Sequence, residues 1–191
     1  MLDRFLSASL GRPTAISEGD CSRDALKPPL RREGEEETSL DSIHAGGLDA
    51  AVRSSQVIGV ILKKVYSRRK ISTGLAHEIA GMCKNWPQML HPSLHWRQGA
   101  TGPAHGIAIL HTNLLCCHTM ILLTRPFFLF MITRLQQSRN TGNVSSPRTI
   151  SRMEKFSQTC VVASYHTVYL VQQAYMENYL PQRNPFALYV N

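Results

Sequence analysis

Apolar residues recur at intervals of three and four positions over most of the chain after residue 47. The first such stretch contains Leu48, Ala51, Val52, Ser55, Ile58, Gly59, Leu62, Val65 and Tyr66. This spacing predicts a helix with one buried stripe. A second helix is predicted over residues 73–86, with an inner side formed by Leu75, Ile79, Met82, Cys83 and Trp86. Pro87 and Pro92 interrupt the pattern that follows, and residues 99–106 are expected to form a loop.

The longest apolar segment covers residues 107–135 and is apolar on most sides of a helix. A helix of this kind lies at the centre of a core or in a membrane. After a predicted loop over residues 138–147, a last helix is indicated by Phe156, Cys160, Ala163, Ser164, Thr167, Val168, Val171, Ala174 and Tyr175. No alternating pattern typical of strands occurs. We therefore predict an all-α fold in which Trp96, Leu110, Leu114, Leu122 and Val168 are buried.

The first 47 residues have a different character. Residues 1–10 fit a short helix that Gly11 and Pro13 would end. Residues 12–47 are rich in Pro, Gly, Ser and charged side chains, which predicts a poorly packed linker or loop. The chain is accordingly divided into residues 1–47 and a helical core over residues 48–191.

Charge separates the same two parts. Residues 1–50 contain ten acidic and six basic side chains, whereas the remaining 141 residues contain three acidic and fifteen basic ones. This asymmetry is compatible with a polyanionic partner and equally with an acidic arm that lies on a basic body. The five cysteines form no disulfide framework and no signal peptide is recognised, so an intracellular protein with reduced thiols is expected.

Candidate chemistry is sparse. His111, Cys116, Cys117 and His118 are the nearest approach to a metal set, but adjacent cysteines point about 100° apart on a helix and one helix cannot aim all four at one ion. His77 and Cys83, six residues apart, do not share a helix face. We predict no metal ligands, no catalytic residues and no enzyme.

A basic cluster near one helix end consists of Lys63, Lys64, Arg68, Arg69 and Lys70. It is compatible with a nuclear import or phosphate-binding patch, and also with a solvated helix end whose cations complement the helix dipole. Within the long apolar segment, Arg125 and Pro126 predict a kink with a structural role.

A membrane span is the alternative for residues 107–132, which exceed the roughly 20 residues that cross a bilayer. The polar side chains inside this stretch, and above all Arg125, are costly in a membrane. A buried core helix is therefore the preferred interpretation.

Four ordered stretches together resemble the regulatory (middle homology) region of fungal binuclear zinc-cluster transcription factors. They include Gly11, Arg12 and Pro13; then Leu94, His95 and Trp96; then His111, Asn113, His118, Arg125 and Pro126; and finally Pro181, Arg183, Asn184, Pro185 and Phe186. In this family the region is joined to an N-terminal cluster of six cysteines that holds two zinc ions. The present chain has no such cluster, because no CxxC pair occurs.

The resemblance implies an irregular helical bundle that is a fragment of a larger helical regulatory domain in the nucleus. It implies that the chain modulates transcription through contacts with other transcription-factor segments, coregulators or small molecules. DNA would be bound only through the missing domain, zinc would be held only there, and this chain would carry no cofactor and no specific affinity for nucleic acids. The alternatives are a small membrane-associated helical protein built on residues 107–132 and a non-functional truncated product.

Overall fold

The structure is a computed structural model that describes residues 7–8, 15, 39–68, 71–84, 86–141 and 147–179. Over these ranges it contains helices and no strand, which confirms the all-α fold. The elements are α2 (Ser39–Ile61), the π-helix η3 (Leu62–Tyr66), α3 (Thr73–Lys84), α4 (Trp86–Met89), the 3₁₀-helix η4 (Pro92–Leu94), α5 (Pro103–Thr141) and α6 (Pro147–Met176).

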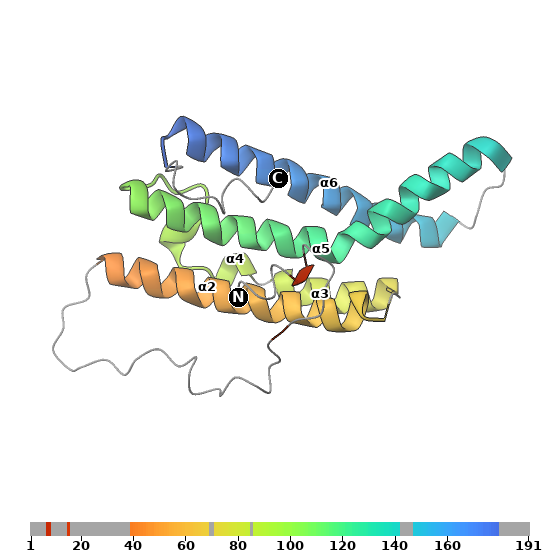
Figure 1. Cartoon of the computed structure of the whole chain (residues 1–191), viewed down its shortest axis with the longest axis horizontal. Helices are drawn as coiled ribbons and strands as arrows, with labels where there is room; N and C mark the ends of the chain where they lie inside the picture. The colour runs from red at the N-terminus through yellow and green to blue at the C-terminus, as the bar shows by residue number, and fades with distance from the viewer. Residues whose placement is uncertain are drawn as a thin grey trace.

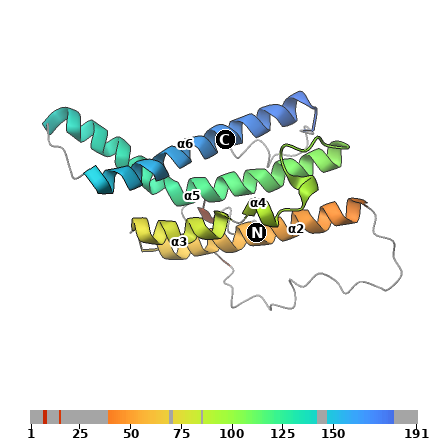
Figure 2. The same ribbon diagram turned by 180° about the vertical axis from the view of Figure 1, so that it is seen from behind.

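Helix α5 forms the middle of the fold. It runs between α2 and α3 on one side and α6 on the other, as both ribbon views show (Figures 1 and 2), and it packs against all three. This position explains why α5 is apolar on most of its sides, since a central helix needs a buried stripe for each neighbour.

Three clusters of buried side chains hold the layers together. The largest joins α2, η3, α3 and α5 and contains Val57, Ile58, Ile61, Val65, Ala76, Ile79, Leu122, Leu123 and Phe127. A second joins the start of α2, the segment before α5 and the first turns of α5, and contains Ile43, Ala50, Leu90, Leu94 and Ile109. A third joins α5 to α6 through Leu110, Leu114, Leu170 and Ala174. The predicted burial of Leu110, Leu114 and Leu122 is thereby confirmed.

The start of α2 differs from the prediction. This helix begins at Ser39 and not at Leu48, and Ile43, which we had assigned to a poorly packed loop, is part of the core. The buried face is also rotated from the predicted stripe, because Leu48 is 66% exposed. Residues 12–38, apart from Ala15, lie outside the described ranges.

Close packing explains the presence of Gly46, which lies in the stretch that we expected to form a loop. A Cβ atom on Gly46 would lie 3.1 Å from Cβ of His91 and 3.2 Å from Cδ1 of Leu94. Glycine at this position therefore lets α2 approach the segment around η4 closely, and it does not interrupt the helix.

The predicted second helix is divided in two. Helix α3 starts after Ser72, whose side-chain oxygen accepts a hydrogen bond from the backbone N–H of Leu75 at 3.1 Å, a typical N-cap. It ends at Lys84 and α4 begins at Trp86. Ile79 is buried as predicted, whereas Met82 is 49% exposed and does not belong to the inner side.

Pro126 lies inside α5 and leaves one carbonyl group without its helical partner. Proline has no N–H, so the carbonyl oxygen of Leu122, four residues earlier, loses its regular hydrogen bond. The Tyr66 hydroxyl, at the end of η3, donates to that oxygen at 2.9 Å. Arg125 itself is exposed. The structural role predicted for Pro126 thus includes a contact between α5 and η3 that the sequence pattern did not indicate.

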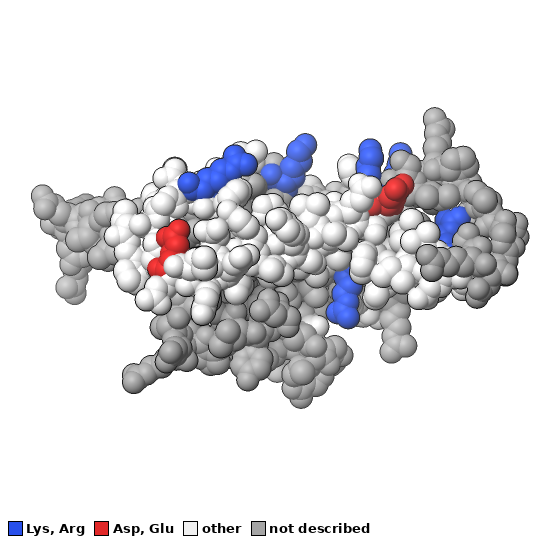
Figure 3. Space-filling model, turned by 90° about the horizontal axis from the view of Figure 1, so that it is seen from above, with Lys and Arg blue, Asp and Glu red and all other residues white. Residues whose placement is uncertain are grey.

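Helix α6 begins with Pro147 and ends in a Schellman motif. Asn178 has a positive φ of 61°, and the backbone N–H of Tyr179 donates to the carbonyl oxygen of Ala174 at 2.8 Å. The side of α6 that faces α5 consists of Cys160, Ala163, Thr167, Leu170 and Ala174. Val168 is 58% exposed, so its predicted burial is wrong. Seen from above, the layer that contains α6 carries few charged side chains along its middle (Figure 3).

Candidate ligand cleft at the end of the α5–α6 hairpin

Two of the stretches that carry the family resemblance meet through Asn113. Its side-chain N–H group donates to the carbonyl oxygen of Leu94 at 2.9 Å and to that of Ile109 at 2.7 Å. Leu94 is completely buried, so the carbonyl lies at the edge of the core. A side-chain amide that donates twice links the segment around η4 to the first turns of α5.

His105 holds the same segment from the other side. Its Nδ1 accepts a hydrogen bond from the backbone N–H of Thr101 at 3.1 Å and contacts the Thr101 hydroxyl at 3.0 Å. Because Nδ1 accepts, a neutral ring carries its hydrogen on Nε2, which lies 2.8 Å from the carbonyl oxygen of Ser93. His105 and Asn113 together position residues 93–101 against α5.

Trp96 lies at the rim of this segment and is 38% exposed, so the prediction that it is buried is wrong. Its ring makes edge contacts with the rings of His166 and Tyr169 in α6, at centroid distances of 5.8 Å and 6.0 Å. The Arg97 guanidinium lies 5.1 Å from the centroid of the same ring, a cation–π arrangement. Trp96 thus connects the η4 segment to α6 while it remains partly exposed.

A cleft of about 390 Å³ opens beside Trp96, between residues 96–100, the start of α5 and the end of α6. This volume lies within the range of small-molecule sites, about 300–1,000 Å³. Its lining consists of Trp96, Arg97, Gln98, Gly99, Ala100, Gly106, Ile109, Leu110, Tyr169, Leu170, Gln173, Ala174, Glu177 and Tyr179.

Tyr179 reaches the cleft because of the way in which α6 ends. The left-handed conformation of Asn178 turns the chain back, and the Tyr179 ring then lies against Gly106 of α5. A Cβ atom on Gly106 would be only 2.6 Å from two atoms of that ring. Interaction with the neighbouring Glu177 side chain is the main cause of the raised pKa of the Tyr179 phenol.

The cleft combines aromatic surface with groups of opposite charge. Trp96, Tyr169 and Tyr179 offer ring faces and edges, while Arg97 and Glu177 offer a cation and an anion. Such a site suits a small ligand with a planar or apolar body and polar ends. Of these five residues, only Trp96 belongs to a stretch that the sequence pattern marks. The others come together through the turn after α6, for which Asn178 was the available signal.

Three of the five residues of the basic cluster, Lys63, Lys64 and Arg68, lie within the described part of the chain. Lys64 forms an ion pair with Glu78 at 3.0 Å, which ties η3 to α3. Lys63 and Arg68 are exposed, and Arg69 and Lys70 lie outside the described residues. An exposed pair of this type contributes little to stability.

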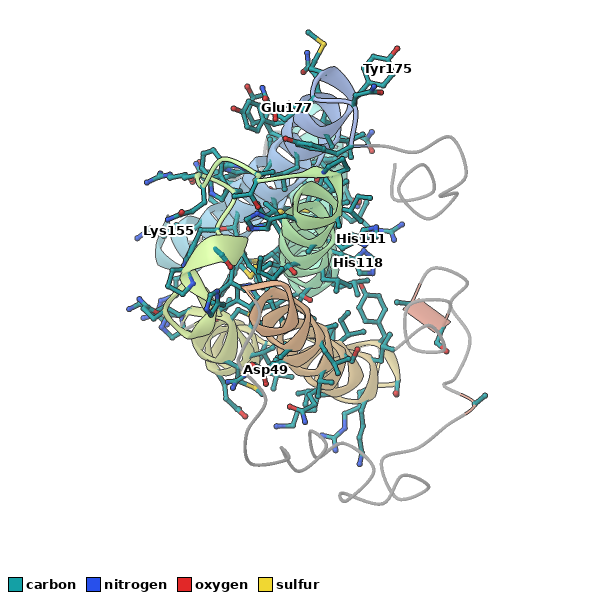
Figure 4. All side chains as sticks on the ribbon, turned by 90° about the vertical axis from the view of Figure 1, so that its left-hand side faces the viewer. Asp49, His111, His118, Lys155, Tyr175 and Glu177 are labelled. Atoms are coloured by element: carbon teal, nitrogen blue, oxygen red, sulfur yellow. The ribbon has the colours of Figure 1, made fainter. Side chains whose placement is uncertain are left out.

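His111 and His118 lie on the same side of α5 (Figure 4), as their seven-residue spacing predicts. Burial lowers the pKa of both imidazoles. Burial also raises the pKa of the neighbouring thiols, to about 12 for Cys116. No group of three or more metal-ligating side chains occurs within the part of the chain that the structure describes.

Of the other residues in the four stretches that resemble the family, only some lie within the described ranges. His95 and Pro126 are half-buried. Gly11, Arg12 and Pro13, and likewise Pro181, Arg183, Asn184, Pro185 and Phe186, lie outside the described residues.

Comparison with known proteins gives no relative: no family model, no curated protein and no solved structure matches the chain. Within the described ranges, one helical segment, Pro103–Gln137, is long and apolar enough to cross a membrane. Length and composition alone decide that criterion, and core helices of soluble proteins also meet it.

Proposed function

We propose that this chain is a helical regulatory module of a transcription factor of the fungal zinc-cluster type. It acts in the nucleus by binding other transcription-factor segments, coregulators or a small molecule. DNA binding and the two zinc ions belong to a domain outside this chain.

The observation that supports the proposal best is the hydrogen bond from Asn113 to the carbonyl oxygen of Leu94. It joins two stretches that resemble the family, although these residues are 19 positions apart. The resemblance therefore falls on residues that are structurally coupled. The cleft adjoins this junction through Trp96, so a ligand that contacts Trp96 or Arg97 would also press on the segment that Asn113 holds.

A reporter assay tests the regulatory role. The chain is inserted between a heterologous DNA-binding domain and an activation domain in fungal cells, and reporter output is compared with that of the fusion without the insert. We expect the insert to change the output several-fold. Arg97→Ala, at the rim of the cleft, should reduce this change at equal protein level. Leu48→Ala, at an exposed position of α2, should not.

Equal output with and without the insert would contradict the proposed function. If Arg97→Ala and Leu48→Ala reduce the change in output equally, the regulatory effect does not depend on the cleft.

A gel-shift experiment tests the absence of specific DNA recognition. The chain should show no preference among unrelated duplexes, and any binding should weaken steeply as salt rises, because phosphate attraction alone has that dependence. A strong preference for one sequence at physiological salt would refute this part of the proposal.

Membrane association is the second candidate function, and the segment Pro103–Gln137 is the observation that favours it. Beyond Pro126, α5 exposes Leu129, Phe130 and Leu135. Cell fractionation distinguishes the two functions. Retention of the chain in membranes after carbonate extraction supports the membrane candidate, while a soluble nuclear pool supports the regulatory one.

A further inference from the structure

The outer side of α6 is exposed to solvent, yet it carries almost no charged side chains. Residues 156–176 contain no Asp, Glu, Lys or Arg. Along this stretch Val161, Val162, Tyr165, Val168, Tyr175 and Met176 are between 53% and 73% exposed. Exposed helix faces in soluble proteins normally carry charged residues opposite the buried stripe. An uncharged and largely apolar face of this kind is typical of an interaction surface.

The exposed positions follow the spacing of a helix–helix seam. Val161, Tyr165, Val168, Gln172 and Tyr175 are separated by alternate steps of four and three, which is the heptad pattern of packed helices. The side of α6 that packs on α5 has its own series with the same alternation, from Cys160 to Ala174. Helix α6 therefore carries two seams, and within the described part of the chain α5 covers one of them.

We propose that the outer seam of α6 (Val161, Tyr165, Val168, Gln172 and Tyr175) binds the same seam of a second copy of this chain, antiparallel and centred on Val168. The surface lies on the opposite side of α6 from α5, and Tyr175 points away from the bundle in the end-on view (Figure 4). Such self-association is independent of the regulatory role proposed above.

Shape complementarity favours this antiparallel register. A two-fold axis at Val168 brings Val161 of each copy opposite Tyr175 of the other, so a small side chain meets a large one at both ends. The same axis places Tyr165 near Gln172, where a phenol and an amide can form a hydrogen bond. In a parallel pair Tyr175 would meet Tyr175 and Val161 would meet Val161, which leaves a crowded end and an underpacked end. A self-complementary patch of this type is what a two-fold dimer requires.

The available area and the lack of charge agree with a second copy. The four apolar side chains of the seam, together with Val162 and Met176 at its edges, are each exposed by half or more. At about 100 Å² each they offer roughly 600 Å² per copy, which is at the lower end of specific interfaces. The middle of the face is without charged groups (Figure 3). It therefore suits an equally uncharged surface better than nucleic acid or an acidic peptide.

Sedimentation equilibrium of the full chain tests the proposal. The parent chain should approach twice its 21.4 kDa mass as concentration rises. Val168→Glu, at an exposed position, should keep the helical circular dichroism spectrum. It should raise the dimer Kd by about 100-fold or more, because two carboxylates would meet at the centre of the seam. Met82→Glu is the matched control: it also adds a carboxylate at an exposed apolar site, but on α3, and should leave the Kd unchanged.

Disulfide trapping tests the register. Val168→Cys should give a covalent dimer under mild oxidation, because that residue faces its own copy in the proposed pair. Val161→Cys alone should not, since only a parallel pair brings its two copies together. The parent chain and Met82→Cys serve as controls for the native cysteines.

Several results would overturn the proposal. The first is a chain that stays monomeric at all concentrations up to about 100 μM, roughly 100-fold above a micromolar Kd. The others are a dimer that Val168→Glu does not weaken, and equal weakening by Met82→Glu. Efficient trapping of Val161→Cys would overturn the antiparallel register. A chain that stays monomeric but binds phosphatidylcholine vesicles through this face would identify a lipid surface as the occupant.

Discussion

At the scale of single residues, Gly106 shows how one missing side chain shapes the candidate cleft. Glycine within a helix costs stability, by about 1 kcal/mol relative to alanine. Here the cost is offset by the Tyr179 ring, which occupies the space that a Cβ atom would fill. Because Tyr179 lines the cleft, the glycine connects the backbone of α5 with the shape of the site.

We therefore expect Gly106→Ala to destabilise the chain by about 1–3 kcal/mol through overpacking, as measured by urea unfolding. Gly81→Ala is the control, because a Cβ atom there meets nothing within 4 Å and the variant should gain up to about 1 kcal/mol of helix propensity. In a Tyr179→Ala background the cost of Gly106→Ala should disappear. Persistence of the cost in that background would show that Tyr179 is not its cause.

His111 and His118 make stability depend on pH in a defined direction. Burial lowers the pKa of each imidazole below 6.5 in the folded chain. The unfolded chain therefore binds protons at a higher pH than the folded chain does. The stability that the neutral rings contribute is fully present above pH 6.5 and is lost as the pH falls through the lowered values.

Urea unfolding at about pH 7.5 and about pH 5 should accordingly show a lower free energy of unfolding at the acidic value. The double variant His111→Gln, His118→Gln should lose less on acidification than His77→Gln, which makes the same replacement at an exposed position. An equal loss in both variants would rule out the α5 histidines as the source.

Trp96 shows why side-chain burial was only partly predictable. Leu110, Leu114 and Leu122 lie on α5, whose neighbours cover several sides, so their apolar character was sufficient to predict their burial. Trp96 and Val168 are also apolar, but each would be buried only if a further element packed against its side of the fold. The spacing of apolar residues within one helix does not indicate whether another element packs against its outer face.

At the scale of elements, helix type was predictable and helix ends were not. The pattern of three and four identified the helical segments, but Gly46 and the polar residues around it suggested a loop where α2 already runs. The reason for Gly46 is its contact with His91 and Leu94, which lie more than 40 residues later. A long-range contact of this kind leaves no local signal.

Pro126 and Tyr66 provide the sharpest prediction at this scale. Tyr66→Phe should cost about 1–3 kcal/mol, because the Leu122 carbonyl would lose its donor. In a Pro126→Ala background the alanine N–H restores the helical hydrogen bond to that carbonyl, and the cost should fall below about 0.5 kcal/mol. A double-mutant cycle measures this coupling. Additive effects would mean that the Tyr66 hydroxyl does not replace the bond that proline removes.

At the scale of the whole molecule, the layered arrangement around α5 leaves two apolar surfaces exposed among the residues that the structure describes. One is the outer seam of α6. The other is the end of α5 beyond Pro126, where Leu129, Phe130, Ile132 and Leu135 are exposed and the helix extends past α2 and α3 (Figure 1). The all-α class followed from the helical periodicity and the lack of an alternating pattern. The sequence could not indicate which faces would stay uncovered, since that depends on how the helices cross.

The second surface leads to a prediction about the product in the cell. If the chain belongs to a longer regulator, other helices of that regulator would cover the end of α5, as the burial of apolar area requires. An immunoblot with an antibody raised against residues 150–191 should then detect a band far above 21.4 kDa, which disappears when the gene is disrupted. A single band near 21.4 kDa would contradict a longer regulator. In that case the end of α5 would have to be covered by another molecule, and the membrane candidate would gain the support that the regulatory one loses.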